Sequence, residues 1–229
     1  MHIVVLESGQ DWIGSAQRHF RRAGHIVSLM DPTPEGLDHL AVASLDLLAI
    51  DAGRLCADLA RPLATLLGRQ PELAVVAIGA RGEQAADCLD AGADLVVADA
   101  GDRDTLLASA IAAVRRARGH AGPRIAAGPL SLDLHGRTCA LNGRPVALSD
   151  TEYRLLEALL LRQGTVVTRS MLLELLYEPG AEPQARTLDL FVHRLRWKLA
   201  APRMPNLIET RRNGFAITAA RSGAQPIAA

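Results

Sequence analysis

The sequence is short of cysteine, of aromatic residues and of long apolar stretches. Of its 229 residues only three are cysteine, and Phe, Trp and Tyr together make up 3%. Cys56, Cys88 and Cys139 are isolated and form no C-x-x-C motif, which argues against a disulfide framework and against a zinc site. Charged residues, glycine or proline interrupt every apolar stretch before it reaches the roughly 20 residues that cross a bilayer. Because no basic leader precedes the first apolar run either, we expect a cytoplasmic protein without a membrane partner.

The motifs that usually mark enzymes are missing too. Neither glycine-rich phosphate loop, Gly-x-Gly-x-x-Gly or Gly-x-x-x-x-Gly-Lys, occurs in the chain. We find no pairing of a nucleophile with a base and no cluster of metal ligands, so we expect no enzyme activity, no cofactor and no metal. Cys88 has two interpretations, a redox sensor or a small buried core residue, and we favour the core residue.

The zero net charge of the chain conceals two halves of opposite sign. Residues 1–120 contain 11 arginines and 16 acidic residues, whereas residues 121–229 contain 14 basic and 9 acidic residues. The sign changes at a stretch rich in glycine and proline, residues 118–124. A basic half joined to an acidic half indicates that the C-terminal part meets a polyanion and that the N-terminal part has another task.

The N-terminal half alternates short apolar runs with helical patterns. The five apolar runs are residues 3–6, 25–29, 45–50, 73–78 and 94–98. Strands that are apolar throughout are typical of a parallel sheet with helices on both faces, so we predict a doubly wound α/β domain. In such a sheet functional residues follow the carboxyl ends of the strands. Those positions hold Glu7, Ser8, Asp51, Gly79 with Ala80, and Asp99.

Two segments carry a resemblance to a known domain. Residues 46–51 read Asp-Leu-Leu-Ala-Ile-Asp, and residues 89–94 read Leu-Asp-Ala-Gly-Ala-Asp. With them, residues 1–118 resemble the receiver domain of bacterial response regulators. The resemblance implies that Asp51 is the phospho-acceptor and that a histidine kinase is the partner.

The chain departs from the receiver pattern at the residues that hold and shield the phosphoryl group. A working receiver has two adjacent acids after strand one, Thr or Ser after strand four, and Lys-Pro after strand five. This chain has Ser8 after Glu7, then Gly79, and Asp99 followed by Ala100. The pocket therefore resembles a degenerate receiver.

These departures oppose phosphorylation on physical grounds. Mg²⁺ prefers carboxylate oxygens, and losing one of three pocket acids weakens its site. Asp99 also places a negative charge where phosphoryl transfer needs a positive one. We predict that Asp51 is not efficiently phosphorylated and instead pairs with Arg54 or Arg81 or caps a helix. A conventional response regulator phosphorylated on Asp51 remains the alternative.

The last helix of this half, expected over residues 103–118, bears on oligomerisation. Its segment 106–114 has no charge, and Leu95 replaces an acid that the family uses in the ion pairs of its dimer face. A helix on a sheet buries one apolar stripe, but this helix is apolar nearly all round. We therefore expect a second buried face and a homodimer through the receiver-like domain, formed without phosphorylation.

The C-terminal half predicts a winged helix-turn-helix. Short strands are expected at residues 129–134, 138–141 and 145–148, with turns at His135-Gly136 and Asn142-Gly143. Ser149 and Glu152 fit a capping box for a helix that runs to Arg162. Helices at 169–177 and 185–199 and a hairpin at 207–210 and 215–218 with the basic tip Arg211-Arg212-Asn213-Gly214 follow. In this fold the third helix enters the DNA major groove.

The third helix separates into two faces at 100° per residue. Leu188, Val192, Leu195 and Leu199 form an apolar stripe that faces the core. The opposite side holds Arg186, Leu190, His193, Arg194 and Trp197, flanked by Thr187, Arg196 and Lys198. We expect this side to contact phosphates and base edges, and Arg212 to reach a narrow minor groove. The alternative for Trp197 is a partly buried packing role.

Residues 128–218 resemble the effector domain of the OmpR/PhoB family. The matching motifs include Asn142-Gly143, residues 148–156 and residues 208–215. The resemblance implies that Arg194 approaches a base edge and Leu190 a thymine methyl. It places Arg186, His193, Arg196, Thr210 and Phe215 near the DNA backbone, Phe215 standing for the usual Tyr. It also implies an RNA polymerase contact for the loop 178–183.

We therefore predict four segments: a receiver-like domain at 1–118, a linker at 119–127, a winged-helix domain at 128–221 and a tail at 222–229. The function expected is that of a dimeric, sequence-specific transcription regulator that binds double-stranded DNA without phosphorylation. The second alternative, besides the phosphorylated regulator, is a winged helix that acts as a protein-interaction module on RNA polymerase.

Overall fold

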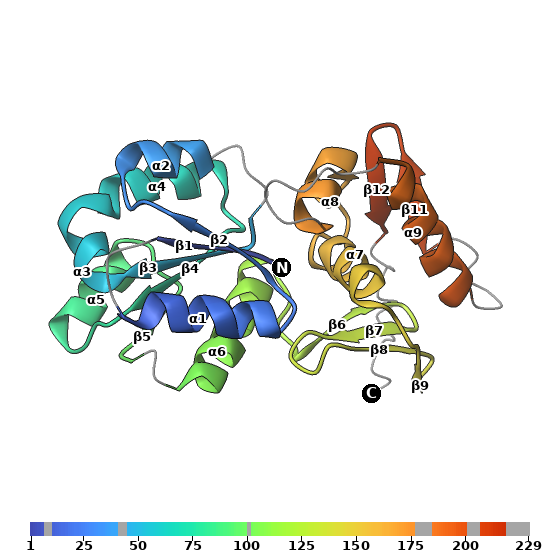
Figure 1. Ribbon diagram of the computed structural model, residues 1–229, viewed down its shortest axis with the longest axis horizontal. Helices are drawn as coiled ribbons and strands as arrows, with labels where there is room; N and C mark the ends of the chain where they lie inside the picture. Colours follow the sequence, from blue (N-terminus) through green and yellow to red (C-terminus); the bar gives the residue numbers. More distant parts are fainter. Residues whose placement is uncertain (7–10, 41–44, 100–101, 177–184, 201–206, 219–229) are drawn as a thin grey trace, which may run out of the picture. The chain divides into compact units, whose positions relative to one another are not determined.

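The computed structural model describes residues 1–6, 11–40, 45–99, 102–176, 185–200 and 207–218 (Figure 1). The chain divides into two compact units, one formed by Met1–Ala121 with Glu174–Glu182 and the other by Gly122–Leu173 with Pro183–Ala229. Within these described ranges no helix is long and apolar enough to cross a membrane.

A parallel five-stranded sheet forms the centre of the first unit. Its strands, in the order β2-β1-β3-β4-β5, are β2 (Ile26–Met30), β1 (His2–Leu6), β3 (Leu47–Asp51), β4 (Ala74–Ile78) and β5 (Leu95–Val97). Every neighbouring pair is parallel. The predicted doubly wound α/β fold is confirmed, and each strand begins and ends within two residues of its predicted position.

Helices cover both faces of this sheet (Figure 1). They are α1 (Asp11–Arg22), α2 (Pro34–Leu40), α4 (Ala60–Arg69), α5 (Glu83–Asp90) and α6 (Arg103–Ala117). Alternate strand residues such as Val4, Leu48 and Val75 join Leu37 of α2 and Leu63 of α4 in one buried cluster. The apolar strands are therefore explained by burial on both sides.

The chain between β3 and β4 starts a helix directly at Asp51. The short helix α3 (Ala52–Arg54) passes into a π-helical segment η1 (Leu55–Leu59) and then into α4. Leu55, Leu59 and Leu63 are all fully buried, so the segments keep one apolar face on the sheet. Asp51 thus lies between a strand and a helix that follows without a loop.

The second unit begins with an antiparallel four-stranded sheet, ordered β6-β7-β8-β9. Its strands are β6 (Arg124–Ala127), β7 (Leu130–Asp133), β8 (Thr138–Leu141) and β9 (Arg144–Pro145). β6 occupies part of the segment expected to be a linker, and its alternating burial of Ile125 and Ala127 shows why it belongs to the sheet. β9 is shorter than the strand predicted at 145–148, although Val146 N still donates to Cys139 O at 2.8 Å.

Three helices and a second sheet complete this unit. The helices are α7 (Asp150–Leu161), α8 (Arg169–Leu176) and α9 (Ala185–Lys198), and the sheet has the order β10-β12-β11. Its strands are β10 (Val167–Thr168), β12 (Gly214–Ile217) and β11 (Ile208–Arg211). The predicted capping box is present: Ser149 Oγ accepts from Glu152 N at 3.3 Å, and Ser149 N donates to Glu152 Oε2 at 2.8 Å. The winged-helix prediction is confirmed.

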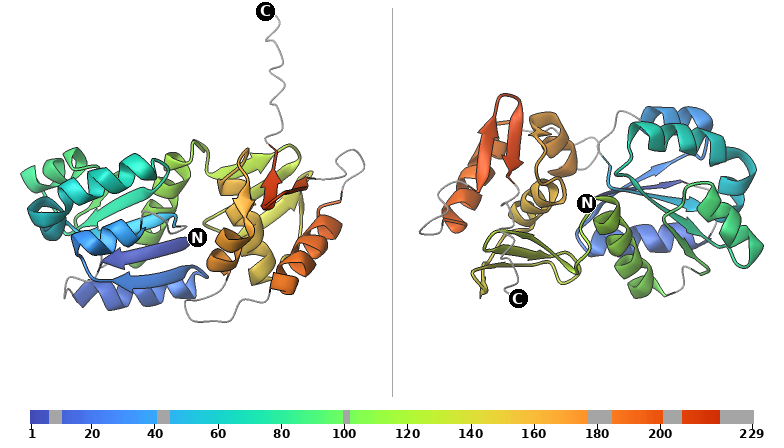
Figure 2. Two further views of the ribbon diagram at one scale, coloured as in Figure 1. Left: turned by 90° about the horizontal axis from the view of Figure 1, so that it is seen from above. Right: turned by 180° about the vertical axis from the view of Figure 1, so that it is seen from behind.

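The hairpin β11–β12 is the wing, and Figure 2 shows it beside α9. Its two strands are joined by a two-residue turn, Arg212 and Asn213. β12 passes very close to β10, since a Cβ added at Gly214 would lie 2.0 Å from Val167 O. Only glycine fits this contact.

Candidate nucleic-acid interface

One side of α9 is fixed against the core of the second unit. Leu188, Val192, Leu195 and Leu199 are each exposed by 3% or less, and α9 packs on α7. The apolar stripe predicted from the helical period is therefore confirmed. Because the stripe fixes the rotation of the helix, it also decides which residues face away from the core.

The opposite side of α9 is open. Leu190 is 47% and Trp197 is 78% exposed, and His193 and Arg194 are exposed as well. Leu190 and Trp197 each lie three or four positions from the adjacent pair His193 and Arg194, and the four form what we call the outward face of α9. Their exposure places two large apolar groups beside a guanidinium and an imidazole. Of the two flanking N-terminal residues, Thr187 is half-buried, and the side chain of Arg186 lies outside the described part of the structure.

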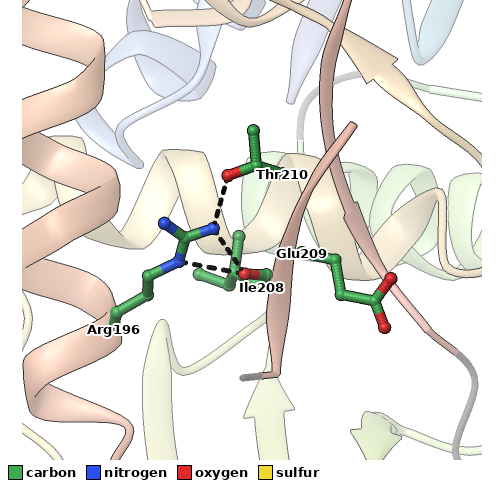
Figure 3. A pocket seen from close by; sticks show the side chains of 4 residues that line it. All are labelled: Arg196, Ile208, Glu209 and Thr210. Atoms are coloured by element: carbon green, nitrogen blue, oxygen red, sulfur yellow. Dashed lines mark hydrogen bonds between the residues drawn. The ribbon is translucent and has the colours of Figure 1, made fainter. Parts of the chain in front are cut away.

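Arg196 does not extend outward but binds the wing (Figure 3). Its Nε and Nη2 both donate to Ile208 O, at 3.0 and 2.7 Å, and Nη2 also donates to Thr210 Oγ1 at 2.8 Å. An open pocket of about 420 Å³, lined by Arg196, Ile208, Glu209 and Thr210, lies at this joint. The contact with the DNA backbone that was expected for Arg196 would therefore have to replace these hydrogen bonds within the protein.

Lys198 is turned towards the start of α7. Its Nζ donates to Glu152 Oε2 at 2.7 Å and to Ala147 O at 2.9 Å, and the Glu152 side chain is only 4% exposed. Burial alone would raise the pKa of Glu152, but hydrogen bonds from Lys198 and from Ser149 N hold that pKa below its ordinary value. Lys198 was expected to flank the DNA surface; in the structure its ammonium is bound to the capping box of α7, and a DNA contact stays a prediction.

Some of the wing residues predicted to contact DNA are exposed, and one of them is buried. Thr210, Arg211 and Arg212 are exposed, and Arg211 forms an ion pair with Glu209. Phe215, however, is 1% exposed. The ring belongs to the core of the unit, and the predicted position of this residue near the DNA backbone stays a prediction.

An ion pair that the sequence does not predict lies against the ring of Phe215. Arg169 lies over that ring, with Cζ 4.9 Å from its centroid, and binds Asp189 through two hydrogen bonds of 3.0 and 2.7 Å. The hydrogen bond from Arg169 is the main reason that the pKa of Asp189 is lowered. The pair connects α8 to α9. Twenty residues separate its members, so no helical or strand spacing signals it.

At the carboxyl edge of the first unit, Asp51 caps a helix. Its Oδ1 accepts from Arg54 N at 3.2 Å, while the Arg54 guanidinium binds Asp58 at 3.0 Å and Pro32 O at 3.2 Å. The capping alternative for Asp51 is thus the one that the structure has. Gly79 lies next to Asp51, because a Cβ at Gly79 would be 3.9 Å from Asp51 Oδ2.

The other residues of the expected pocket are only partly placed. Asp99 is exposed, and Glu7 and Ser8 lie outside the described residues. The φ angle of Gly79 is +97°, so a Thr or Ser there would be strained. No group of three or more His, Cys, Asp or Glu side chains suited to a metal occurs among the residues that the structure describes.

The large apolar side chains of α6 all pack within their own unit, and the expected second buried face stays a prediction. Leu106, Leu107, Ala110, Ile111, Ala113 and Val114 are all buried, and α6 packs on β4, β5 and α1 of its own unit. The remaining side carries small or polar residues, among them the exposed Ala108. Much of the uncharged stretch is therefore used in packing within the unit.

Known proteins resemble the chain over its C-terminal unit and over most of its length. The family model described as "Transcriptional regulatory protein, C terminal" matches residues 143–215. The cell cycle response regulator CtrA of Brucella anthropi is 30% identical over 203 residues, and the match covers 88% of each chain. The cell cycle transcriptional regulator CtrA of Caulobacter vibrioides is 29% identical with the same coverage.

Among solved structures, the response regulator DrrB of Thermotoga maritima, described as an OmpR/PhoB homolog, is 23% identical. The match covers 95% of this chain and 98% of that chain, with a TM-score of 0.42. That superposition is loose, so the assignment depends on the sequence relatives and on the matched C-terminal family model. From these, the chain belongs to the OmpR/PhoB family of DNA-binding response regulators.

Proposed function

We propose that the chain is a cytoplasmic, sequence-specific transcription regulator that reads DNA with the outward face of α9. The observation that carries the proposal is the division of α9 into a buried apolar stripe and an exposed side with Leu190, His193, Arg194 and Trp197. A B-DNA major groove about 12 Å wide admits one α-helix. A helix held by one side and open on the other suits that groove.

Each exposed group has a chemical counterpart on DNA. The guanidinium of Arg194 suits guanine O6 and N7, and the Leu190 side chain suits a thymine methyl group. His193, together with Arg186 and Thr187 at the start of the helix, suits phosphates. Trp197, at 78% exposed, favours a partner contact over the packing alternative.

The wing supplies the second contact in the proposal. Arg212 occupies the tip of a two-residue turn, from which an arginine can enter a narrow minor groove. Thr210 and Arg211 are exposed on the adjoining strand and suit phosphate oxygens. Helix and wing would then touch neighbouring grooves.

Activity without phosphorylation is the second part of the proposal. Asp51 already caps α3, and Asp99 puts a negative charge on the same edge of the sheet. Treatment with acetyl phosphate and Mg²⁺, followed by intact-protein mass spectrometry, should leave the mass unchanged. A stoichiometric gain of one phosphoryl group would contradict this part and favour the conventional regulator, with a histidine kinase as partner.

Dimerisation through the receiver-like unit is the third part. A regulator of this fold covers two half-sites about one helical turn, roughly 10 base pairs, apart, which calls for two copies of α9. Because the apolar side of α6 is used within its own unit, we assign the contact to α5, where Leu89 is 50% exposed. Light scattering at micromolar concentration should report a dimer, and Leu89→Glu should report a monomer. An RNA polymerase contact would involve the loop 178–183, which lies outside the described residues.

Selection of genomic DNA fragments by the purified chain, without any phosphodonor and at about 150 mM salt, tests the main proposal. A repeated motif with two half-sites is the expected result. Recovery of fragments no different from random DNA would overturn it. Arg194→Ala, compared with the exposed Arg144→Ala on β9, should lose the motif while the control keeps it.

A further inference from the structure

We propose that Arg196 is a positioning residue, which fixes the wing beside α9 before DNA arrives, and not a phosphate ligand. The inference depends on the proposed function, since the wing matters only if it meets DNA. It concerns the one arginine of α9 whose guanidinium, in the described part of the helix, is hydrogen-bonded to the wing.

The geometry of Arg196 is that of a clamp. Two of its three guanidinium nitrogens, Nε and Nη2, converge on Ile208 O, and Nη2 also reaches Thr210 Oγ1. The planar group therefore spans two positions of β11 at once. Ile208 is itself 1% exposed, so the carbonyl that accepts these bonds belongs to a residue anchored in the core.

Arg196 binds β11, a strand that has a hydrogen-bonded neighbour on one side in the described structure. β11 stands at the edge of its sheet and pairs only with β12 in the described structure. An edge strand has backbone groups without a ladder partner. Hydrogen bonds from a charged donor are stronger than those between neutral groups, so Arg196 stabilises this edge more than a neutral side chain would.

The far end of the wing is fixed by a different helix. Arg169 N, at the start of α8, donates to Asn213 O in the turn at 3.0 Å, and Gly214 lies against Val167 of β10. The Arg169 side chain binds Asp189 of α9. The base of the wing is thus tied to α9 and its tip to α8, which sets the distance from the outward face of α9 to Arg212.

A wing that is already fixed lowers the loss of conformational entropy on DNA binding. A loop that is already placed loses less conformational entropy when it binds, so more of its contact energy appears as affinity. It also places Arg212 at one distance from Arg194, which favours DNA sites with one spacing between the two contacts. If Arg196 released β11 to bind a phosphate, both advantages would be lost.

The variant Arg196→Lys distinguishes the positioning role of Arg196 from the effect of its positive charge. Lysine keeps the positive charge but has a single ammonium in place of the planar fork, so it cannot reproduce both contacts. Hydrogen–deuterium exchange of the free, full-length chain is the first measurement. The amides of β11 and β12 should exchange about tenfold faster in Arg196→Lys, and those of α7 should not change. Thr210→Val, which removes one acceptor and no charge, should show a smaller change in the same amides.

The second measurement is a double-mutant cycle on the selected DNA site. Arg212→Ala should weaken specific binding about tenfold in the wild type, and about twofold or less once Arg196 is lysine, because the wing no longer delivers the arginine. Binding to random DNA should be nearly unchanged by Arg196→Lys. A general loss of folding would lower both kinds of binding together and would speed exchange in α7.

Two results would overturn the inference. One is unchanged exchange in β11 and β12 of Arg196→Lys. The other is an Arg212→Ala effect of the same size in both backgrounds. If the wild type selects no DNA site, the proposed function fails, and the exchange measurement still decides whether Arg196 holds the wing.

Discussion

Arg194 and Arg196 stand two residues apart on α9 and have different surroundings. The outward face, with Arg194, is open to solvent, whereas Arg196 binds β11 and Lys198 binds Glu152. All three side chains contribute equally to a count of positive charge. The comparison teaches that the cations of a basic helix differ in availability: those that a neighbouring element binds are not free to serve the proposed DNA contact in the same way as those that it leaves open.

Gly214→Ala should have the largest effect on stability. It would disturb the packing of β12 against β10 and leave the outward face of α9 unchanged. Its new methyl would lie 2.0 Å from Val167 O, so β10 and β12 must separate. We expect a loss of about 3 kcal/mol in the free energy of unfolding of the C-terminal unit, as for an overpacked core. Urea unfolding followed by pulsed hydrogen–deuterium exchange of the α7 amides measures it.

The matched control is Gly143→Ala. Gly143 has a φ of +75° but nothing within 4 Å of an added Cβ, so it should cost only about 1 kcal/mol of backbone strain. Equal losses for the two variants would mean that the contact with Val167 is unimportant.

Arg194→Ala should change binding and leave folding alone. Its guanidinium is exposed, so we expect the free energy of unfolding to change by less than about 0.5 kcal/mol. Binding to the selected site should weaken by about 1 to 3 kcal/mol, with little change on random DNA. Fluorescence anisotropy with both duplexes measures the difference. If the losses on the two duplexes were equal, Arg194 would be a phosphate contact and not a base contact.

Lys198→Met should lower the stability of the fold and leave DNA binding nearly unchanged. Removing Lys198 leaves the carboxylate of Glu152, only 4% exposed, without its ion-pair partner, and we expect a loss of about 1 to 2 kcal/mol in the free energy of unfolding. DNA affinity should stay within about twofold of the wild type at low ionic strength. A tenfold weaker DNA affinity with unchanged stability would put Lys198 back on the DNA surface.

The smallest effect expected is a change in the pH dependence of stability. Because the folded protein holds the pKa of Glu152 below its unfolded value, the resulting stability is fully present above about pH 4.5 and is lost as the pH falls through the folded pKa. Asp133 and Asp189 shift the same way, so their contributions remain when Glu152 is changed. Glu152→Gln should therefore reduce, and not abolish, the loss of stability between pH 5 and about pH 3. An unchanged pH profile would contradict the role given to Lys198.

Periodic patterns predicted the fold well because burial produces them directly. The apolar strands of the first unit, the stripe Leu188, Val192 and Leu195, and the capping box at Ser149 all appear where the sequence placed them. β6 was missed because glycine and proline around residues 119–123 suggested a linker, and its four residues are too few for a clear alternation.

The candidate site was harder to predict, for a different reason. A helical period gives the direction in which a side chain leaves the helix, but Arg and Lys are long enough to turn towards a neighbour. Arg196 and Lys198 therefore bind groups, Ile208 O and Glu152, that are distant in the sequence. Phe215 was placed near DNA because the family has a Tyr at that position. The contact of its ring with Arg169 depends on a helix 46 positions earlier in the sequence.

The uncharged stretch of α6 has a second explanation besides a dimer contact. The stretch 106–114 indicated two buried faces on α6, but several of its residues are alanines that fit close to β4, β5 and α1. Small side chains allow a wide contact with one's own sheet, so the absence of charge does not by itself predict a partner.

The most direct test of the account compares two affinities of the untreated wild-type chain at about 150 mM salt. One duplex carries the selected motif, and the other has the same base composition in scrambled order. The account predicts that the motif is bound at least about a thousandfold more tightly, as for other specific regulators. Equal affinities for the two duplexes would contradict it, because the outward face of α9 would then attract DNA without reading its sequence.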